Sequence, residues 1–191
     1  MNNSGITIRA ATDDDKDAVL ALAPRLAEGL PPWRNAGEAL AAGRRWLEDS
    51  LAAAAAASAA GDAAVFVAVD TASIVGVISV RASRHFTGER DGYIGELVVA
   101  ERAARRGIGS ALVAAADDWG REHGLANLTL HTGAFNTPAR AFYAAIGFAA
   151  EEVRLTRAVS PVLPGCVHLA KQLLVRTGGL LQQQFHRVLA V

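Results

Sequence analysis

Residues 93–113 read YIGELVVAERAARRGIGSALV, and the fold is decided by this stretch. Its beginning, Tyr93 to Val99, is rich in β-branched and other apolar residues and predicts a strand. From Gly107 to Gly124 the pattern changes to helical, and the expected inner side carries Ile108, Leu112, Val113, Ala116 and Trp119. The chain therefore runs from a strand through a glycine-containing turn into a helix.

The turn between this strand and this helix, Ala104 to Ser110, is a candidate phosphate site. A helix start leaves backbone N–H groups unpaired at the positive end of the helix dipole. Gly107 and Gly109 have no side chain to obstruct a phosphate, and Arg105 and Arg106 add positive charge. The turn lacks the G-K-[ST] ending of a Walker loop and the third glycine of G-x-G-x-x-G. The alternative is that the two glycines merely make a tight turn.

The residues before this stretch predict two strands in a hairpin, preceded by a strand and two helices. The hairpin strands are 65–69 and 74–80, and a first strand is expected over 6–9. Thr12 and the acids after it are typical of a helix start. A second helix is expected from residue 37 past Trp46, with a partly buried face made of Leu40, Trp46, Leu47 and Leu51.

The residues after the stretch predict a strand over 128–131, a helix over 137–145 and a final strand over 148–155. The whole order indicates a mixed α/β domain.

Residues 136–148 read NTPARAFYAAIGF and carry a second motif, N-x-x-A-x-x-F-Y-x-x-x-G-F. With the turn at 104–110, it resembles the GCN5-related N-acetyltransferase (GNAT) family. The resemblance extends over Ile6 to Val159 and is specific from Tyr93 to Phe148. It implies a mixed, mostly antiparallel sheet flanked by helices, with splayed fourth and fifth strands. Residues 1–159 are thus expected to form a GNAT-like acetyltransferase domain.

The resemblance implies acetyl-CoA as cosubstrate and no metal. The pyrophosphate would bind the backbone amides of the first motif, which here belong to Arg105, Arg106, Gly107, Ile108, Gly109 and Ser110. The position before them, usually Gln or Arg, is Ala104, so Arg105 or Arg106 is left to compensate. Pantetheine would pair like a strand with the main chain of Leu97, Val98 and Val99, and an N–H near Val98 would polarise the thioester carbonyl.

The resemblance also implies catalytic roles. Asn136 would bind the pantetheine arm, cap the following helix, or do both. Tyr143 would protonate the leaving thiolate, since a phenol is protonated at neutral pH. Glu96 is the candidate general base, a structural carboxylate being the alternative, and His131 and His85 are further candidates for relaying a proton.

The composition of the chain limits which partners and which location are expected. The chain has 191 residues, 51% of them hydrophobic, with 19 basic and 19 acidic side chains and a formal net charge of zero. Without a basic surplus, neither nucleic acid nor a membrane surface is an expected partner. The single cysteine, Cys166, cannot form an internal disulfide, which favours a reducing compartment. The start of the chain does not resemble a signal peptide, so a cytoplasmic location is expected.

The function that follows is transfer of acetyl from acetyl-CoA to a primary amine by direct attack in a ternary complex. Acids at Glu89, Asp91 and Glu96 would suit a cationic acceptor such as an aminoglycoside, a polyamine or lysine. The loop 84–91 and the helices between residues 13 and 51 would form the wall of its pocket. The alternative is a non-catalytic CoA-binding regulatory module on the same fold.

The last residues, 160–191, form a C-terminal tail outside the family core. Leu181, Phe185 and Val188 recur at i, i+4 and i+7, a helical stripe that needs a cover. Either the domain itself or the other subunit of a homodimer would supply that cover, and partial disorder of the tail is the alternative.

Overall fold

The computed structural model describes residues 5–57, 61–157 and 159. The chain divides into two compact units, Met1–Ala149 and Ala150–Val191. The described residues of the second unit contain neither helix nor strand. The tail residues Cys166, Leu181, Phe185 and Val188 lie outside the described residues, so the expected dimer contact stays a prediction.

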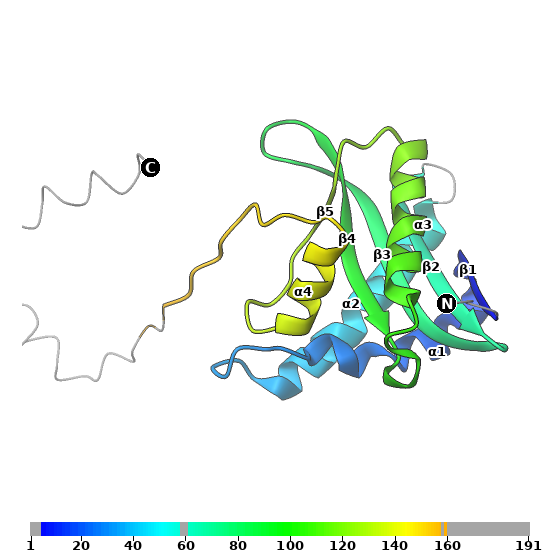
Figure 1. The fold of residues 1–191 in the computed structure, drawn as a ribbon, viewed down its shortest axis with the longest axis horizontal. Helices are drawn as coiled ribbons and strands as arrows, with labels where there is room; N and C mark the ends of the chain where they lie inside the picture. The colour runs from blue at the N-terminus through cyan, green and yellow to red at the C-terminus, as the bar shows by residue number, and fades with distance from the viewer. Residues whose placement is uncertain (1–4, 58–60, 158, 160–191) are drawn as a thin grey trace, which may run out of the picture. The chain divides into compact units, whose positions relative to one another are not determined.

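The described residues of the first unit form five strands and four α-helices (Figure 1). The strands are β1 (Ile6–Ala10), β2 (Ala63–Asp70), β3 (Ser73–Arg84), β4 (Arg90–Val99) and β5 (Leu128–Leu130). The helices are α1 (Lys16–Leu20), α2 (Ala36–Ala56), α3 (Ile108–Glu122) and α4 (Thr137–Ala145). Short 3-10 turns are η1 (Asp13–Asp15), η2 (Ala23–Ala27) and η4 (Glu101–Ala103).

The strands form one sheet in the order β1-β2-β3-β4-β5. Neighbours from β1 to β4 are antiparallel, and β4 pairs with β5 in parallel. The predicted fold class, a mixed and mostly antiparallel sheet flanked by helices, is confirmed.

β4 contains a bulge and separates from β5 where the bulge begins. Ile78 pairs with Leu97 but Val80 pairs with Ile94, so β4 has one residue more than β3 across this step. The pairing of β4 with β5 ends at Ile94 and Leu130, whereas β4 continues to Val99. The two strands therefore splay as predicted.

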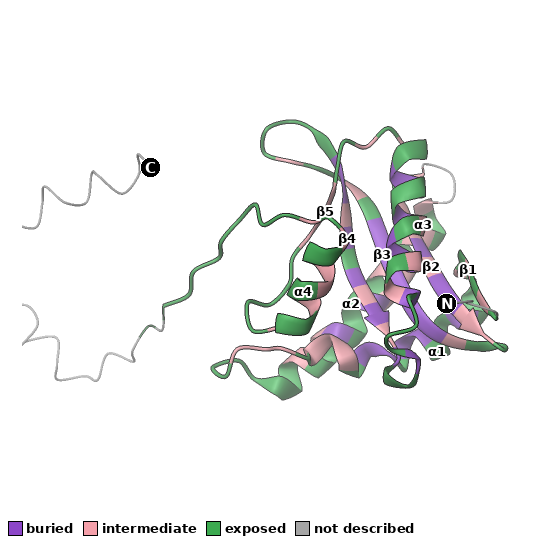
Figure 2. Cartoon of the chain, in the orientation of Figure 1, coloured by how far each residue is buried: buried purple, intermediate pink, exposed green. Residues whose placement is uncertain are grey.

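Helices α2 and α3 cover opposite faces of the sheet (Figure 1). A Cβ on Gly76 would lie 3.0 Å from Leu112 of α3, so that glycine lets α3 approach β3 closely. A Cβ on Gly95 would instead meet Ser50 of α2 at 3.8 Å. Figure 2 shows burial concentrated in β2–β4 and on the inner side of α3. The predicted inner residues of α3, Ile108, Leu112, Val113, Ala116 and Trp119, are all buried.

Two expectations about the fold were wrong. The final strand over 148–155 is absent from the described residues, and Val153 and Leu155 are 83% and 88% exposed, so they have no sheet to join. On α2, Leu47 is buried and Leu51 is half-buried against the core as expected, but Leu40 and Trp46 are 45% and 53% exposed. Trp46 adjoins Leu47 in sequence, and one residue turns the helix by about 100°, which takes its side chain off the buried stripe.

Candidate active site

The turn before α3 presents consecutive unpaired amides. Arg105 and Gly107 have φ angles of 64° and 75°, in the left-handed region, and Gly107 is the N-cap of α3. The N–H groups from Arg105 to Ser110 donate no hydrogen bond to any described residue. Backbone amides in such a turn at a helix start form a concave anion site. A left-handed arginine is strained, and strain of this kind concentrates at ligand-binding loops.

The two arginines of this turn differ. Arg106 Nη1 lies 2.6 Å from Asp70 Oδ2 on β2, and this pairing lowers the pKa of Asp70. Arg105 makes no ion pair with a described residue, so compensation for Ala104 by Arg105 stays a prediction.

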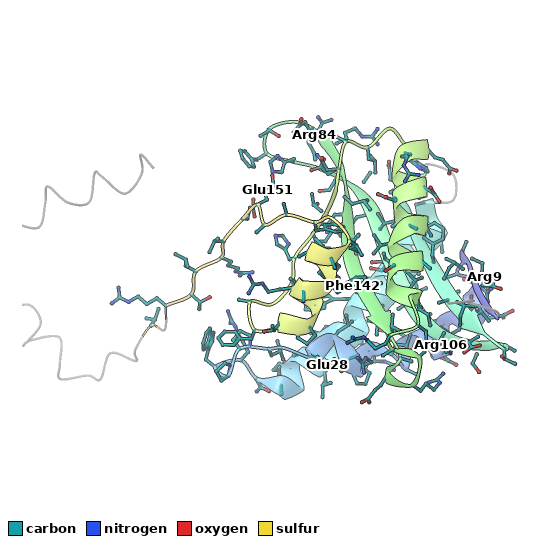
Figure 3. The ribbon with its side chains drawn as sticks, in the orientation of Figure 1. Arg9, Glu28, Arg84, Arg106, Phe142 and Glu151 are labelled. Atoms are coloured by element: carbon teal, nitrogen blue, oxygen red, sulfur yellow. The ribbon has the colours of Figure 1, made fainter. Side chains whose placement is uncertain are left out.

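The two sequence motifs meet at Gly109. A Cβ there would lie 3.1 Å from the Phe142 ring, so the missing side chain admits an aromatic ring of α4. Figure 3 shows Phe142 between α4 and α3, and Arg106 near the start of α3. Gly109 therefore serves packing, whereas a Cβ on Gly107 would meet nothing within 4 Å. That both glycines clear space for a phosphate stays a prediction.

The second half of β4 has one open edge. Ala100 N donates to Val75 O of β3 at 2.8 Å. Because antiparallel strands alternate, Val98 also directs its N–H and C=O toward β3, while Leu97 and Val99 direct theirs to the open edge. No described strand pairs with that edge beyond Ile94. The amides available at the open edge near Val98 are therefore those of its two neighbours, Leu97 and Val99, and a thioester donor among them stays a prediction.

Glu96 is buried in the bulge, on the face of the sheet that α2 covers. Its Oε2 accepts hydrogen bonds from Ser79 Oγ of β3 and, at 2.8 Å, from Ser50 Oγ of α2. Its backbone N–H donates to Ser79 Oγ at 3.0 Å. Burial raises the pKa of Glu96, and the two hydroxyl donors and Arg81 partly oppose that rise. A carboxylate with a raised pKa suits a general base.

Asn136 and Tyr143 lie on α4 as the motif predicts. Asn136 caps the helix by accepting from Ala139 N at 3.2 Å, and its Nδ2 donates to Glu28 O at 3.4 Å. Tyr143 is half-buried, with its ring 5.5 Å from that of Phe148. Burial raises the pKa of Tyr143 to about 12, so the phenol keeps its proton at neutral pH.

The two candidate histidines lie far apart. Tyr93 Oη lies 3.1 Å from His131 Nδ1, just beyond the end of β5. His85 lies at the tip of the β3–β4 hairpin, where its Nδ1 is 2.6 Å from Thr87 Oγ1. The chain turns at His85 to Glu89, so His85 lies near the level of Glu89, roughly 20 Å along β4 from Glu96, and is not placed to relay a proton there.

The three acids expected around a cationic acceptor do not gather. Glu89 is at the hairpin tip, about 20 Å along the strand from Glu96. Asp91 is buried and accepts from Asn127 Nδ2 at 3.0 Å, which joins the start of β4 to the segment before β5.

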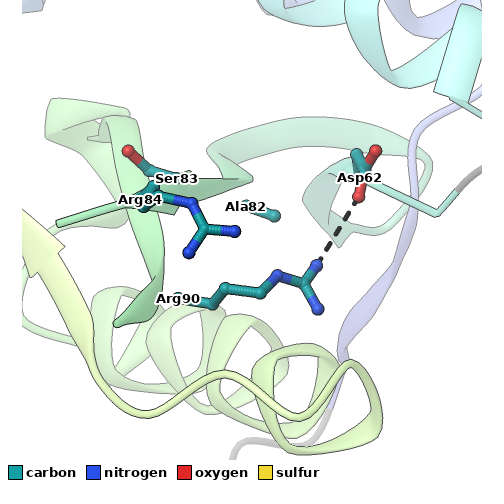
Figure 4. A pocket seen from close by; sticks show the side chains of 5 residues that line it. All are labelled: Asp62, Ala82, Ser83, Arg84 and Arg90. Carbon is teal, nitrogen blue, oxygen red and sulfur yellow. Dashed lines mark ion pairs between the residues drawn. The ribbon is translucent and has the colours of Figure 1, made fainter. Parts of the chain in front are cut away.

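A shallow pocket beside the hairpin carries mostly positive charge. Figure 4 shows the guanidinium groups of Arg84 and Arg90 there, with Arg90 Nη2 3.8 Å from Asp62 Oδ1. Arg84 and Arg90 also occupy directly opposite positions in the register of β3 and β4. The side of the hairpin that lines this pocket is therefore basic, and the loop 84–91 as a wall of the acceptor pocket stays a prediction.

Four residues of this region were not anticipated from the sequence. Ser79 is a polar residue inside an apolar strand, and this exception to the pattern could have indicated a site residue. Nothing in the sequence around Ser50 indicates such a role. Trp33 and Phe135 form an edge-to-face pair with centroids 5.5 Å apart, and both are more than half exposed. They join the segment before α2 to the β5–α4 loop, a contact that only folding creates.

Within the described ranges, no cluster of three or more His, Cys, Asp or Glu residues is arranged to hold a metal ion. No described helix is long and apolar enough to cross a membrane.

The profile of the acetyltransferase (GNAT) family matches residues 31–148, more than half of the chain, and the chain belongs to this family. The curated proteins searched give no significant match.

Solved structures with the same fold include proteins of different descriptions. One is a transcriptional regulator from Bacillus halodurans C-125, with 23% identity and a TM-score of 0.59, covering 81% of this chain and 99% of that one. AAC(6')-Iy, bound to the bisubstrate analogue CoA-S-monomethyl-acetylneamine, has 21% identity and a TM-score of 0.59, covering 82% and 99%. Glucosamine-6-phosphate N-acetyltransferase from Arabidopsis thaliana has 18% identity and a TM-score of 0.57, covering 81% and 99%.

Proposed function

We propose that the protein transfers acetyl from acetyl-CoA to a primary amine by direct attack in a ternary complex. One observation carries this proposal: the unpaired amides from Arg105 to Ser110 follow directly on the open edge of β4. A pyrophosphate bound at the first feature would leave the pantetheine arm lying along the second. The described residues therefore fit acetyl-CoA as cosubstrate.

The order of groups along β4 supports one choice of polarising amide. Moving away from the phosphate turn, the open edge presents first Val99 and then Leu97, and Glu96 comes next. The amide of Leu97 thus donates to the thioester carbonyl, where negative charge develops during attack. Val99 pairs with the arm closer to the phosphates.

Two side chains handle protons. Glu96 accepts the proton that the amine loses as the C–N bond forms. Tyr143 donates its phenolic proton to the sulfur as the C–S bond breaks, and its raised pKa keeps that proton available. Asn136 holds the start of α4 and binds the pantetheine arm.

The acceptor class stays a proposal with a wide range. AAC(6')-Iy and the glucosamine-6-phosphate N-acetyltransferase support amino sugars, and polyamines and protein lysine are the other cationic amines proposed. Acetyl-CoA would be mixed with each amine in turn, with thiol release and the mass of the product as readouts. Wild type should acetylate at least one amine, and Glu96→Gln should lower turnover by about 10²–10⁴-fold with CoA affinity retained.

A second candidate is a CoA-binding regulatory module, which the fold shared with a transcriptional regulator favours. It predicts that calorimetry detects CoA binding and that no amine gives a product. It also predicts that Glu96→Gln leaves the affinity for CoA unchanged.

A further inference from the structure

The bulge of β4 is built around one hydroxyl. Ser79 Oγ accepts a hydrogen bond from the backbone N–H of Glu96 and donates a second hydrogen bond to the Glu96 carboxylate. A single side chain on β3 thereby constrains both the main chain and the side chain of the bulged residue. A Cβ on Gly95 would lie 2.8 Å from the same Oγ, so glycine at that position leaves room for the hydroxyl.

A second hydroxyl reaches the same oxygen from another element. Ser50 Oγ, on α2, donates to Oε2 at 2.8 Å. Oε1 accepts no hydrogen bond from a described residue. Every fully buried side-chain N or O atom of the described residues has a hydrogen-bond partner, so Oε1 is not fully buried. Oε1 therefore touches solvent, while Oε2 is held.

We propose that Ser50 and Ser79 are positioning residues that anchor Glu96 Oε2 so that Oε1 alone is directed at the amine. This rests on the proposed function. An unanchored glutamate would lose rotamer freedom at each turnover, whereas two donors on rigid elements hold it ready beforehand. The arrangement also links α2 to the base of the reaction through Ser50.

The charged groups around Glu96 are few. Asp49 on α2 raises its pKa, Arg81 on β3 lowers it, and the two serine donors lower it as well. Since a hydrogen bond to the charged form favours that form, removing either hydroxyl should raise the carboxyl pKa further. Opening the site to water would instead lower the pKa, so the sign of the change separates the two effects.

The test is a carbon-13 NMR titration of the glutamate carboxyl groups in the full-length chain, with Glu96 assigned from the signal missing in Glu96→Gln. Ser79→Ala and Ser50→Ala should each move the Glu96 titration to higher pH. Ser83→Ala, an exposed serine on β3, is the matched control and should leave it unchanged. Ser50→Thr keeps a hydroxyl and should retain the wild-type titration. If Ser79→Ala does not fold, the comparison of Ser50→Ala with Ser50→Thr still tests the role of the hydroxyl.

An unchanged or lowered Glu96 pKa in both alanine variants would overturn the positioning role. The titration needs no acceptor, so it is independent of the proposed activity. Once an acceptor is known, the acidic limb of kcat/KM against pH should move in the same direction as the titration. A titration that moves while the limb does not would retain the anchoring by the serines and reject Glu96 as the base.

Discussion

The two halves of β4 differ in what lies on their edges. From Arg90 to Ile94 the strand pairs with β3 on one side, and from Gly92 to Ile94 it also pairs with β5 on the other. From Leu97 to Val99 it pairs with β3 alone, and its other edge presents free polar groups. The bulge at Gly95 and Glu96 lies between the halves.

The first half is committed to the fold and the second half is open to a ligand. A buried strand edge without a partner costs free energy, so an open edge at the centre of a domain is retained where a bound molecule completes it. Substitutions in the first half should therefore lower stability, and those along the second half should lower binding or turnover.

The largest expected effect separates chemistry from binding on the open side. Tyr143→Phe keeps the ring packing but removes the donor, so turnover should fall by about 10²–10⁴-fold when acetyl transfer limits the rate. CoA affinity should stay within about twofold of wild type. The measurement is turnover at saturating acetyl-CoA, with calorimetry for affinity.

The other tyrosine of the chain supplies the control. Tyr93→Phe removes the hydroxyl that faces His131. If this variant loses more turnover than Tyr143→Phe, the proton comes from the pair of Tyr93 and His131 instead.

The next effect concerns the phosphate turn. Gly107→Val places a branched side chain in a left-handed position beside the unpaired amides, so the Kd for CoA should rise by about 100-fold or more. Gly124→Val, at the far end of α3, is the matched control. Gly124 also has a positive φ, of 64°, and a Cβ added there would meet nothing within 4 Å. The two variants should lose similar stability, and equal CoA affinity in both would contradict the phosphate assignment.

A third substitution addresses the half of β4 that is paired on both edges. A Cβ on Gly92 would lie 2.6 Å from Leu128, so Gly92→Val should destabilise the domain by about 1–3 kcal/mol through overpacking between β4 and β5. Gly120→Ala, where a Cβ would lie 3.6 Å from the same leucine, should stabilise α3 by about 0.5–1 kcal/mol. Urea unfolding measures both, and an undiminished midpoint for Gly92→Val would show that this half is not tightly packed.

The smallest effect lies on the opposite edge of the sheet, far from the site. Arg9 holds Asp15 in a bidentate ion pair at 2.6 and 2.8 Å, which lowers the pKa of Asp15. A carboxyl with a lowered pKa contributes stability above its unfolded pKa, near 4, and that stability is lost as pH falls toward the folded value. Asp15→Asn should cost about 1 kcal/mol at pH 7, since Arg9 is partly exposed, and less below pH 4. A cost independent of pH would contradict this account.

Local patterns in the sequence were enough to predict much of the fold. The hairpin of β2 and β3, the strand β4, the helix α3 and the capped helix α4 were all expected, because alternation, helical spacing and capping residues are properties of short segments. The turn at 104–110, Asn136 and Tyr143 were predicted as site residues from two motifs, each of which lies within one segment.

Only the tertiary structure decided which atoms are free. The register of β4 against β3 takes the amide of Val98 and leaves those of Leu97 and Val99, and a shift by one residue would reverse this. Likewise Ser50 and Ser79 meet Glu96 from elements distant in the sequence, Asp91 is taken by Asn127, and Trp33 meets Phe135. Such pairings depend on how whole elements pack, which no short stretch of sequence encodes by itself.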